Sequence, residues 1–192
     1  MLRQQQPALH SVCVFCGSRM GTNPRYAEDA TTVGRMLAQG GWRLVYGAGD
    51  VGLMGVVARA AQAAGGETFG VIPVHLLNRE VGKRDLSHLV ITEDMHERKK
   101  VMFMNSDIIL VLPGGAGSLD EFFEVLTWAQ LGLHAKPILL LDTEGYWQPL
   151  VALVDHMIAN GFIDPSLRGF FRLLASPADL STALASLSAA WR

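Results

Sequence analysis

The sequence predicts an α/β fold, a single Rossmann-like domain in which a doubly wound parallel sheet carries helices on both faces. Short apolar runs alternate along the chain with longer helical patterns, and this alternation is typical of a parallel sheet. The short runs are almost continuously apolar, as expected for strands covered on both faces. The length of 192 residues fits one domain, and a hydrophobic content of 49% is too high for a disordered chain.

Each predicted element has a local justification. Strands are short runs of apolar, mostly β-favouring residues. Helices begin after capping residues, as at Asn23 before Pro24, and end at glycines such as Gly65 and Gly161. In chain order, we expect strand 11–15, helix 24–39, strand 43–46, helix 52–64, strand 67–73, a loop or irregular helix over 75–85, strand 89–92, helix 95–105, strand 107–112, helix 118–131, strand 137–141, helix 146–160 and a terminal helix over 178–190.

Charge and hydropathy exclude several functional classes. The chain has 16 Lys and Arg against 18 Asp and Glu, which is not the strongly basic balance of a nucleic-acid-binding protein. No apolar run reaches the roughly 18 residues needed to span a bilayer. Residues 1–10 are polar and lack the apolar core of a signal peptide. We therefore expect a cytoplasmic protein with a flexible lead-in over 1–10, one nucleotide-binding domain over 11–192, and neither nucleic acid nor membrane as a partner.

Cys13 and Cys16 are too few to form a disulfide framework. Their C-x-x-C spacing matches a redox motif. Cys13 lies inside an apolar run, however, so packing in the core is the favoured interpretation. By the same reasoning Met102 and Met104, on either side of Phe103, are expected to belong to the core.

A glycine-rich turn follows the second predicted strand. Residues 47–52 read G-A-G-D-V-G and match the G-x-G-x-x-G fingerprint of dinucleotide-binding folds. The fingerprint also needs an acidic residue at the end of the next strand, whereas Glu67 begins that strand. A tight turn is the plainest interpretation. We favour a wall of a nucleotide pocket, made by Gly47 and Gly49 together with Gly17 and Ser18 after the first strand.

A second glycine-rich segment follows the most apolar strand. Residues 113–121 read P-G-G-A-G-S-L-D-E and open a helix. Free amides and the positive end of the helix dipole make such a turn an anion site, and a phosphate is the natural ligand. The alternative is purely structural, with Ser118 as N-cap and Glu121 as the third residue of a capping box.

Two adjacent cations lie near the start of the preceding helix, within M-H-E-R-K-K at 95–100. A solvated charged face is the usual explanation for such a run. Arg98 and Lys99 nevertheless oppose the helix dipole, which favours a role in binding phosphate or developing negative charge. Arginine suits that role because its planar guanidinium matches phosphate oxygens.

At these two motifs the sequence resembles the LOG (Lonely Guy) family, the cytokinin riboside 5'-monophosphate phosphoribohydrolases. The family pattern P-G-G-x-G-T-x-x-E is present at 113–121 with Ser118 in place of threonine, and M-H-x-R-K is present at 95–99. The similarity extends from about Val12 to Ile163. Members have also been described as possible lysine decarboxylases, but neither Lys99 nor Lys100 lies in an evident pyridoxal phosphate site.

The resemblance implies hydrolysis of the N-glycosidic bond of a purine nucleoside 5'-monophosphate, giving free base and ribose 5-phosphate. Carried over by position, Arg98 and Glu121 are the catalytic pair. The substrate-binding residues implied in the same way are Glu80, Lys99, Gly115, Ala116, Gly117, Ser118, Leu119, Asp120 and Thr127. Neither a cofactor nor a metal is implied, and the histidines form no ligand pattern.

The resemblance also implies a homodimer whose sites lie close to the interface. The helix that carries Phe122, Phe123, Trp128 and Leu131 has much apolar surface, part of which is expected to form that contact. Ala48 and Asp50 depart from the glycine-rich turn usual in the family. Two other functions stay open at this point: a non-catalytic nucleotide or cofactor carrier on the same scaffold, and an NAD-linked oxidoreductase based on residues 47–52.

Overall fold

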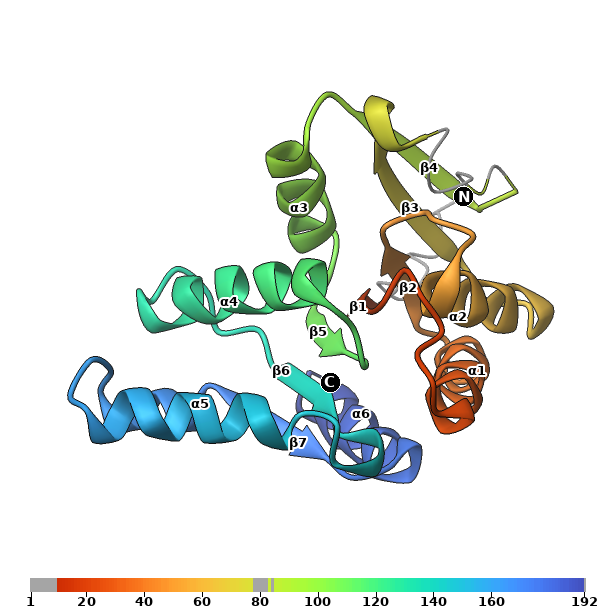
Figure 1. Ribbon diagram of the computed structural model, residues 1–192. Coiled ribbons are helices and arrows are strands. Elements are labelled where there is room, and N and C mark those ends of the chain that lie inside the picture. The colour runs from red at the N-terminus through yellow and green to blue at the C-terminus, as the bar shows by residue number, and fades with distance from the viewer. Residues whose placement is uncertain (1–9, 78–82, 84, 192) are drawn as a thin grey trace, which may run out of the picture.

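The computed structural model describes residues 10–77, 83 and 85–191, and within these ranges all strands belong to one sheet (Figure 1). The sheet has seven strands in the order β4-β3-β2-β1-β5-β6-β7, and every neighbouring pair is parallel. The strands are β1 (Ser11–Phe15), β2 (Arg43–Tyr46), β3 (Thr68–Pro73), β4 (His88–Thr92), β5 (Ile108–Val111), β6 (Ile138–Leu141) and β7 (Phe171–Leu174).

The direction in which strands are added reverses between β1 and β5. Strands β2, β3 and β4 extend the sheet on one side of β1, and β5, β6 and β7 extend it on the other. In doubly wound sheets, ligands bind beyond the carboxyl ends of the strands at this switch point. The segments that follow Phe15 and Val111 therefore mark the expected position of a site.

The helices form two layers, one on each face of the sheet (Figure 1). Helices α1, α2 and α6 cover the face that presents Val12, Leu44 and Leu110, whereas α3, α4 and α5 cover the face that presents Cys13 and Ile109. The helices are α1 (Pro24–Gln39), α2 (Gly52–Ala63), α3 (Met95–Met104), α4 (Ala116–Gln130), α5 (Gln148–Ala159) and α6 (Pro177–Ala190), with 3-10 turns η1 (Val74–Leu76), η2 (Thr143–Gly145) and η3 (Pro165–Gly169).

The predicted fold class is confirmed, and the predicted strands and helices differ from the observed ones mainly at their ends. Helix α4 begins at Ala116 with Gly115 as its N-cap, so Ser118 lies inside the first turn and the predicted capping box is wrong. Strand β7 was not predicted, because its four residues include the exposed Arg172 and lie at a sheet edge. Met104 is 68% exposed. It lies two positions from the buried Met102, which on a helix places the two side chains on different faces.

Residues 1–9, the greater part of the predicted lead-in, lie outside the described residues. The ring of His10, the last residue of that predicted segment, packs against Trp42 and Trp191, with centroid distances of 5.7 and 4.7 Å. None of the helices in the described part of the chain combines the length and hydropathy that a membrane-spanning helix needs.

Helices α1 and α2 are in unusually close contact at Gly34. A Cβ atom on Gly34 would lie 2.3 Å from the carbonyl oxygen of Val57 and 2.9 Å from Cβ of Ala60. The main chain of α2 therefore occupies the space that a side chain on α1 would need. This contact fixes α2, and with it the turn that precedes α2 at the carboxyl edge of the sheet.

We expect Gly34→Ala to lower the free energy of unfolding by about 1–3 kcal/mol, because overpacking displaces α2. Replacing a glycine in a helix interior by alanine normally raises the free energy of unfolding by about 1 kcal/mol. A decrease would therefore indicate overpacking. Urea denaturation followed by circular dichroism measures the change. Gly117→Ala is the matched control, since nothing lies within 4 Å of the position that its new Cβ would take. A stabilised Gly34→Ala protein would contradict the close contact.

Candidate active site

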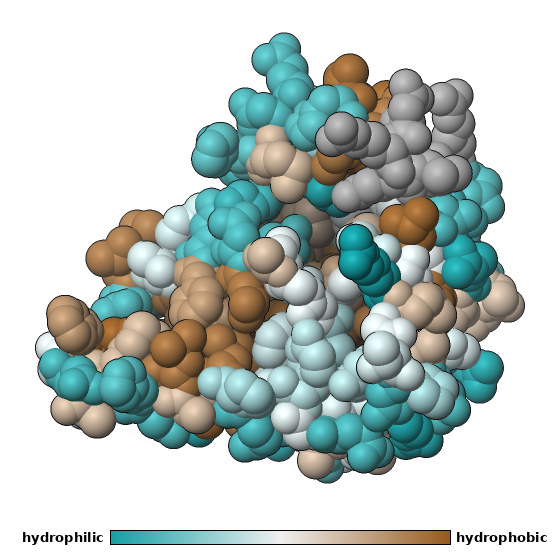
Figure 2. All heavy atoms as spheres, viewed as in Figure 1, coloured by the Kyte–Doolittle hydropathy of each residue, from teal (hydrophilic) through white to brown (hydrophobic). Residues whose placement is uncertain are grey.

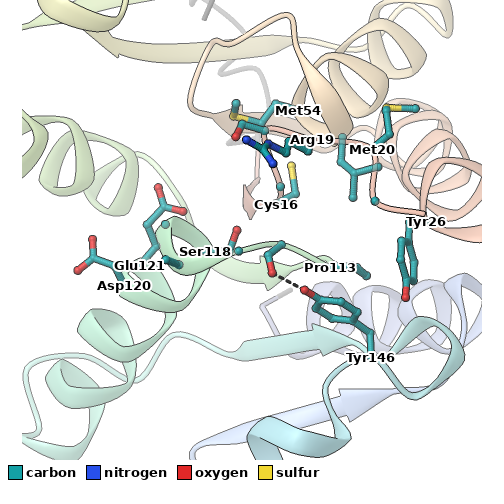
Figure 3. A pocket seen from close by; sticks show the side chains of 18 of the residues that line it. Cys16, Arg19, Met20, Tyr26, Met54, Pro113, Ser118, Asp120, Glu121 and Tyr146 are labelled. Atoms are coloured by element: carbon teal, nitrogen blue, oxygen red, sulfur yellow. Dashed lines mark hydrogen bonds between the residues drawn. The ribbon is translucent and has the colours of Figure 1, made fainter. Parts of the chain in front are cut away.

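A cavity of about 520 Å³ opens at the switch point of the sheet, between the turns that follow β1 and β5 (Figure 3). Its volume lies within the range of roughly 300–1,000 Å³ that is typical of small-molecule sites. Residues from both halves of the chain line it: Cys16, Gly17, Ser18, Arg19, Met20, Gly21, Tyr26, Leu53, Met54, Leu76, Met95, Arg98, Pro113, Gly114, Gly115, Ala116, Gly117, Ser118, Asp120, Glu121 and Tyr146.

Three strand-to-helix turns meet at Gly17. Its N–H donates to the carbonyl oxygen of Pro113 at 3.0 Å, and its carbonyl oxygen accepts from the N–H of Leu53, also at 3.0 Å. The contacts leave no room for side chains. A Cβ on Gly114 would lie 3.0 Å from the nitrogen of Gly17, and one on Gly52 would lie 2.3 Å from the carbonyl carbon of Ser18. The three turns that border the cavity thus meet through main-chain contacts.

The turn after β5 presents the N-terminus of α4 to the cavity. The first amides of a helix have no acceptor inside the helix, and here they belong to Ala116, Gly117 and Ser118. Ser118 is buried, and its Oγ occupies the space that a side chain on Gly114 would take. Gly115 and Gly117 are less crowded than Gly114, because no atom lies within 4 Å of the position that a Cβ on either residue would take. The packing of the protein does not require glycine at these two positions, whereas the close approach of a ligand would.

Arg98 is held rigidly beside this turn. Its side chain is 4% exposed, and its guanidinium donates to the carbonyl oxygens of Val71 at 3.1 Å and Gly47 at 2.7 Å. A Cβ on Gly47 would lie 2.0 Å from Nη2 of Arg98. Gly47 is therefore required by the position of the guanidinium, and it supports the site from behind the cavity wall.

Glu121 lies one turn into α4 and is partly buried. Figure 3 shows Glu121 and Asp120 on the α4 side of the cavity, with Cys16 and Met54 on the opposite side. Burial raises the pKa of the Cys16 thiol, and the negative charge of Glu121 raises it further. Cys16 is therefore a neutral thiol in the cavity wall at physiological pH.

The remainder of the wall is largely apolar. Met20 contributes to it from the segment before α1, Tyr26 from α1, Leu53 and Met54 from α2, and Met95 from α3. Met95 belongs to the M-H-x-R-K motif, but the other four residues lie outside both motifs. Their positions just beyond strand ends were the available signal, because in a parallel sheet these positions share one edge.

Several predicted site residues lie outside the cavity wall. Gly47 and Gly49 are buried behind it, Leu119 is partly buried and packs against the core, and Thr127 is exposed further along α4. Glu80 lies outside the described residues.

Lys99 joins two helices instead of facing the cavity. Its Nζ lies 3.0 Å from Asp120 and 2.6 Å from Glu124, so it links α3 to α4. Burial lowers the pKa of Lys99, but hydrogen bonds to Glu124 and Asp120 outweigh burial, and the net direction is upward. The ammonium is therefore charged and is paired within the chain.

The two departures in the turn after β2 have separate structural consequences. Ala48 adopts a φ of +56°, a left-handed conformation that favours glycine. Asp50 forms an ion pair with Arg59 and lies 4.0 Å from Nζ of Lys83. Its charge is therefore balanced within the chain. The turn holds Arg98 through Gly47, and no wall residue comes from positions 47–52, which does not fit a dinucleotide fingerprint.

Cys13 and Cys16 are both buried and free, as the packing interpretation predicted. Burial, together with the charge of Glu121, raises the pKa of Cys13 well above its ordinary value. Neither thiol has the depressed pKa of a reactive cysteine. Among the described residues, no group of three or more His, Cys, Asp or Glu side chains is arranged to hold a metal ion.

Solved structures with this fold include the molybdenum cofactor binding protein of Rippkaea orientalis. It superposes with a TM-score of 0.71 at 22% sequence identity, covering 95% of this chain and 99% of that one. The molybdenum cofactor carrier protein of Chlamydomonas reinhardtii gives a TM-score of 0.69 at 22% identity, covering 94% and 99%. At this level of identity the likeness establishes the shared fold.

Sequence relatives are considerably closer. The probable cytokinin riboside 5'-monophosphate phosphoribohydrolase of Oryza sativa subsp. japonica is 41% identical over 94% of this chain and 79% of its own length. The enzyme of the same name from Rhodococcoides fascians is 44% identical over 86% of this chain and 84% of its own. The family model described as "Possible lysine decarboxylase" matches residues 54–184. Together with the two motifs that meet in the cavity, these matches show that the chain belongs to the LOG family of cytokinin riboside 5'-monophosphate phosphoribohydrolases.

Proposed function

We propose that this chain is a hydrolase that cleaves the N-glycosidic bond of adenine-type nucleoside 5'-monophosphates, the reaction named for its relatives. One observation carries the proposal. A single cavity contains the amides of a helix N-terminus, a buried guanidinium from Arg98 and the carboxylate of Glu121. These are the groups needed to hold a phosphate and to stabilise opposite charges across a breaking bond.

The 5'-phosphate occupies the turn at the start of α4. Amides of Ala116, Gly117 and Ser118 donate to its oxygens, and the helix dipole favours its charge. The absence of side chains at Gly115 and Gly117 allows the phosphate to approach the main chain closely. Lys99 is not needed in this arrangement, because its charge is taken up by Asp120 and Glu124.

The sugar and base extend from that turn toward the apolar wall made by Met20, Leu53 and Met54. As the bond between C1' and the base nitrogen breaks, its electron pair leaves with the base and positive charge develops on the ribose. The Glu121 carboxylate stabilises this charge and accepts a hydrogen bond from the attacking water. Arg98 stabilises negative charge on the departing base. The water oxygen ends on C1' and one of its protons ends on the base, so the products are free base and ribose 5-phosphate.

We further propose that two copies of the chain form a homodimer through the apolar ends of α3 and α4. Met104, Leu131 and Leu133 are 68%, 67% and 69% exposed. The rings of Phe103 and Trp128, with centroids 5.0 Å apart, hold these two helix ends together. Figure 2 shows apolar residues gathered over α4 and α5. Thr127 lies on the exposed side of α4, where a second copy would cover it.

We expect purified protein to release free base and ribose 5-phosphate from AMP or from isopentenyladenosine 5'-monophosphate, and Glu121→Gln to reduce release roughly 100-fold or more. The substitution keeps the size of the side chain but removes the charge that stabilises the ribose. Chromatography of both products measures the rate, and the rate ratio of the two substrates gives the base preference.

Glu124→Gln is the matched control for that measurement. Glu124 lies one turn further along α4, pairs with Lys99 and does not line the cavity. Near-normal turnover by Glu121→Gln would show that the catalytic assignment is wrong. Nucleotide binding by the unsubstituted protein with no release from either substrate would instead favour a carrier.

We expect Gly47→Ala to reduce kcat/KM roughly 10- to 100-fold without unfolding the protein, because the new Cβ displaces the guanidinium of Arg98. Gly169→Ala, at a surface position with no atom within 4 Å, controls for the loss of glycine itself. The double variant Gly47→Ala/Arg98→Ala should be no worse than Arg98→Ala. If the double variant instead lost kcat/KM by the product of the two single-variant factors, Gly47 would not act through Arg98.

We expect Leu131→Asp to convert the dimer into a monomer, since it buries a charge in an apolar contact. Sedimentation equilibrium measures the mass. Val74→Asp is the control, because Val74 is 61% exposed but follows β3 at the carboxyl edge of the sheet, whereas α3 and α4 end at the opposite edge. A monomeric unsubstituted protein, or a dimer unaffected by Leu131→Asp, would exclude this interface.

A further inference from the structure

Tyr146 is a cavity residue to which neither the motifs nor the proposed reaction assigns a role. It follows η2 at the carboxyl end of β6, so it comes from a different part of the chain than the turns at Gly17 and Gly114. Its hydroxyl donates to the carbonyl oxygen of Gly114 at 2.6 Å, as Figure 3 shows. The tyrosine thus contacts the turn that leads into α4.

The segment that carries Tyr146 is anchored on two sides. The Thr143 hydroxyl donates to Oδ2 of Asp29 in α1 at 2.7 Å, and both residues are buried. The side chain of Asp142 accepts the N–H of Trp147 at 2.6 Å, and the N–H of Asp142 donates to the carbonyl oxygen of Leu174 in β7 at 2.8 Å. These bonds hold the segment independently of the turn that Tyr146 contacts.

The ring of Tyr146 is also fixed by its neighbours. It packs edge-on against Tyr26 and Trp147, with centroid distances of 5.4 and 4.8 Å. The hydroxyl therefore has one preferred position, and it meets a single carbonyl group.

The peptide between Gly114 and Gly115 needs a hydrogen bond of this kind to fix its orientation. Both flanking residues are glycines, so rotation of this peptide meets little steric resistance. In a planar trans peptide the C=O and N–H groups point in opposite directions, so anchoring the Gly114 oxygen also sets the direction of the Gly115 N–H. The preceding peptide is held in the same way, because the Pro113 oxygen accepts from Gly17.

We propose that Tyr146 is a positioning residue for the phosphate site. Its hydroxyl holds the Gly114–Gly115 peptide in the orientation that presents the Gly115 amide, and not the Gly114 carbonyl, to the phosphate. A carbonyl turned toward the phosphate would repel it and would remove one donor. This inference rests on the proposed function for the identity of the ligand, a phosphate monoester, but it does not require that the bond to the base be cleaved.

Tyr146→Phe tests the proposal, because it removes one hydrogen bond and keeps the ring contacts. We expect the dissociation constants of inorganic phosphate and of ribose 5-phosphate, measured by isothermal titration calorimetry, to rise roughly 3- to 10-fold. The KM for a nucleoside 5'-monophosphate should rise by the same factor, while kcat at saturation stays within about 2-fold of the unsubstituted protein. Circular dichroism checks that the fold is intact.

Tyr26→Phe is the matched comparison. It removes the other tyrosine hydroxyl from the cavity wall and leaves the bond to Gly114 in place. Weaker phosphate binding by Tyr146→Phe than by Tyr26→Phe supports the positioning role. Equal effects of the two variants, unchanged phosphate affinity in Tyr146→Phe, or a loss confined to kcat would each overturn it.

Failure of the proposed function gives a different result from failure of this inference. If the unsubstituted protein binds phosphate but releases no base from any nucleotide, the hydrolase function is rejected. The phosphate affinities of Tyr146→Phe and Tyr26→Phe can still be compared in that case. If inorganic phosphate and ribose 5-phosphate do not bind the unsubstituted protein at all, the positioning role is rejected together with the phosphate site.

Discussion

The site depends on a main-chain contact between turns that are far apart in sequence. Gly17 after β1 is bonded through its N–H to Pro113 after β5, and through its carbonyl to Leu53 at the start of α2. This places the start of α4 directly beside the first strand. Side chains at Gly52 or Gly114 would push the turns apart, since their Cβ atoms would lie 3.0 Å or less from neighbouring main chain. Every other element of the cavity is arranged around this junction.

Main chain and side chains have different roles around that junction. The proposed phosphate-binding donors are amides at the start of α4, whose positions follow from the helix and from the glycines before it. The charged groups assigned to the proposed reaction are side chains, and Arg98 is held through the carbonyl oxygens of Val71 and Gly47. The carbonyl oxygens of Val71 and Gly47 and the sulfur of Met95 accept hydrogen bonds from this buried guanidinium, which offsets part of the cost of removing it from water. The position of the Arg98 guanidinium is therefore set by the fold itself.

The sequence carried enough information for the fold and for the two motifs, but not for the full cavity wall. Alternating apolar runs and helical patterns are strong signals, whereas β7 is a four-residue edge strand with one exposed charge. Glycines after strands indicated the correct edge of the sheet. Tyr146 and Met20 belong to no motif, because their roles arise from where the segments meet in space. The expected N-cap, Ser118, lies three residues after the observed one, Gly115, since a glycine N-cap leaves no capping side chain to read.

The proposed phosphate site is made of main-chain amides, and this has an evolutionary consequence. Substitutions at Ala116 or Leu119 change side chains in the same turn without removing a donor, because the N–H groups are common to all residues except proline. The proposed anion site therefore tolerates substitution at these two positions, while the surrounding wall is free to diverge in shape and polarity. In such a scaffold the phosphate is bound by main chain, while the side chains of the cavity wall determine which ligand is selected. Substitutions in the wall can then change the preferred phosphorylated ligand and leave the phosphate-binding amides in place.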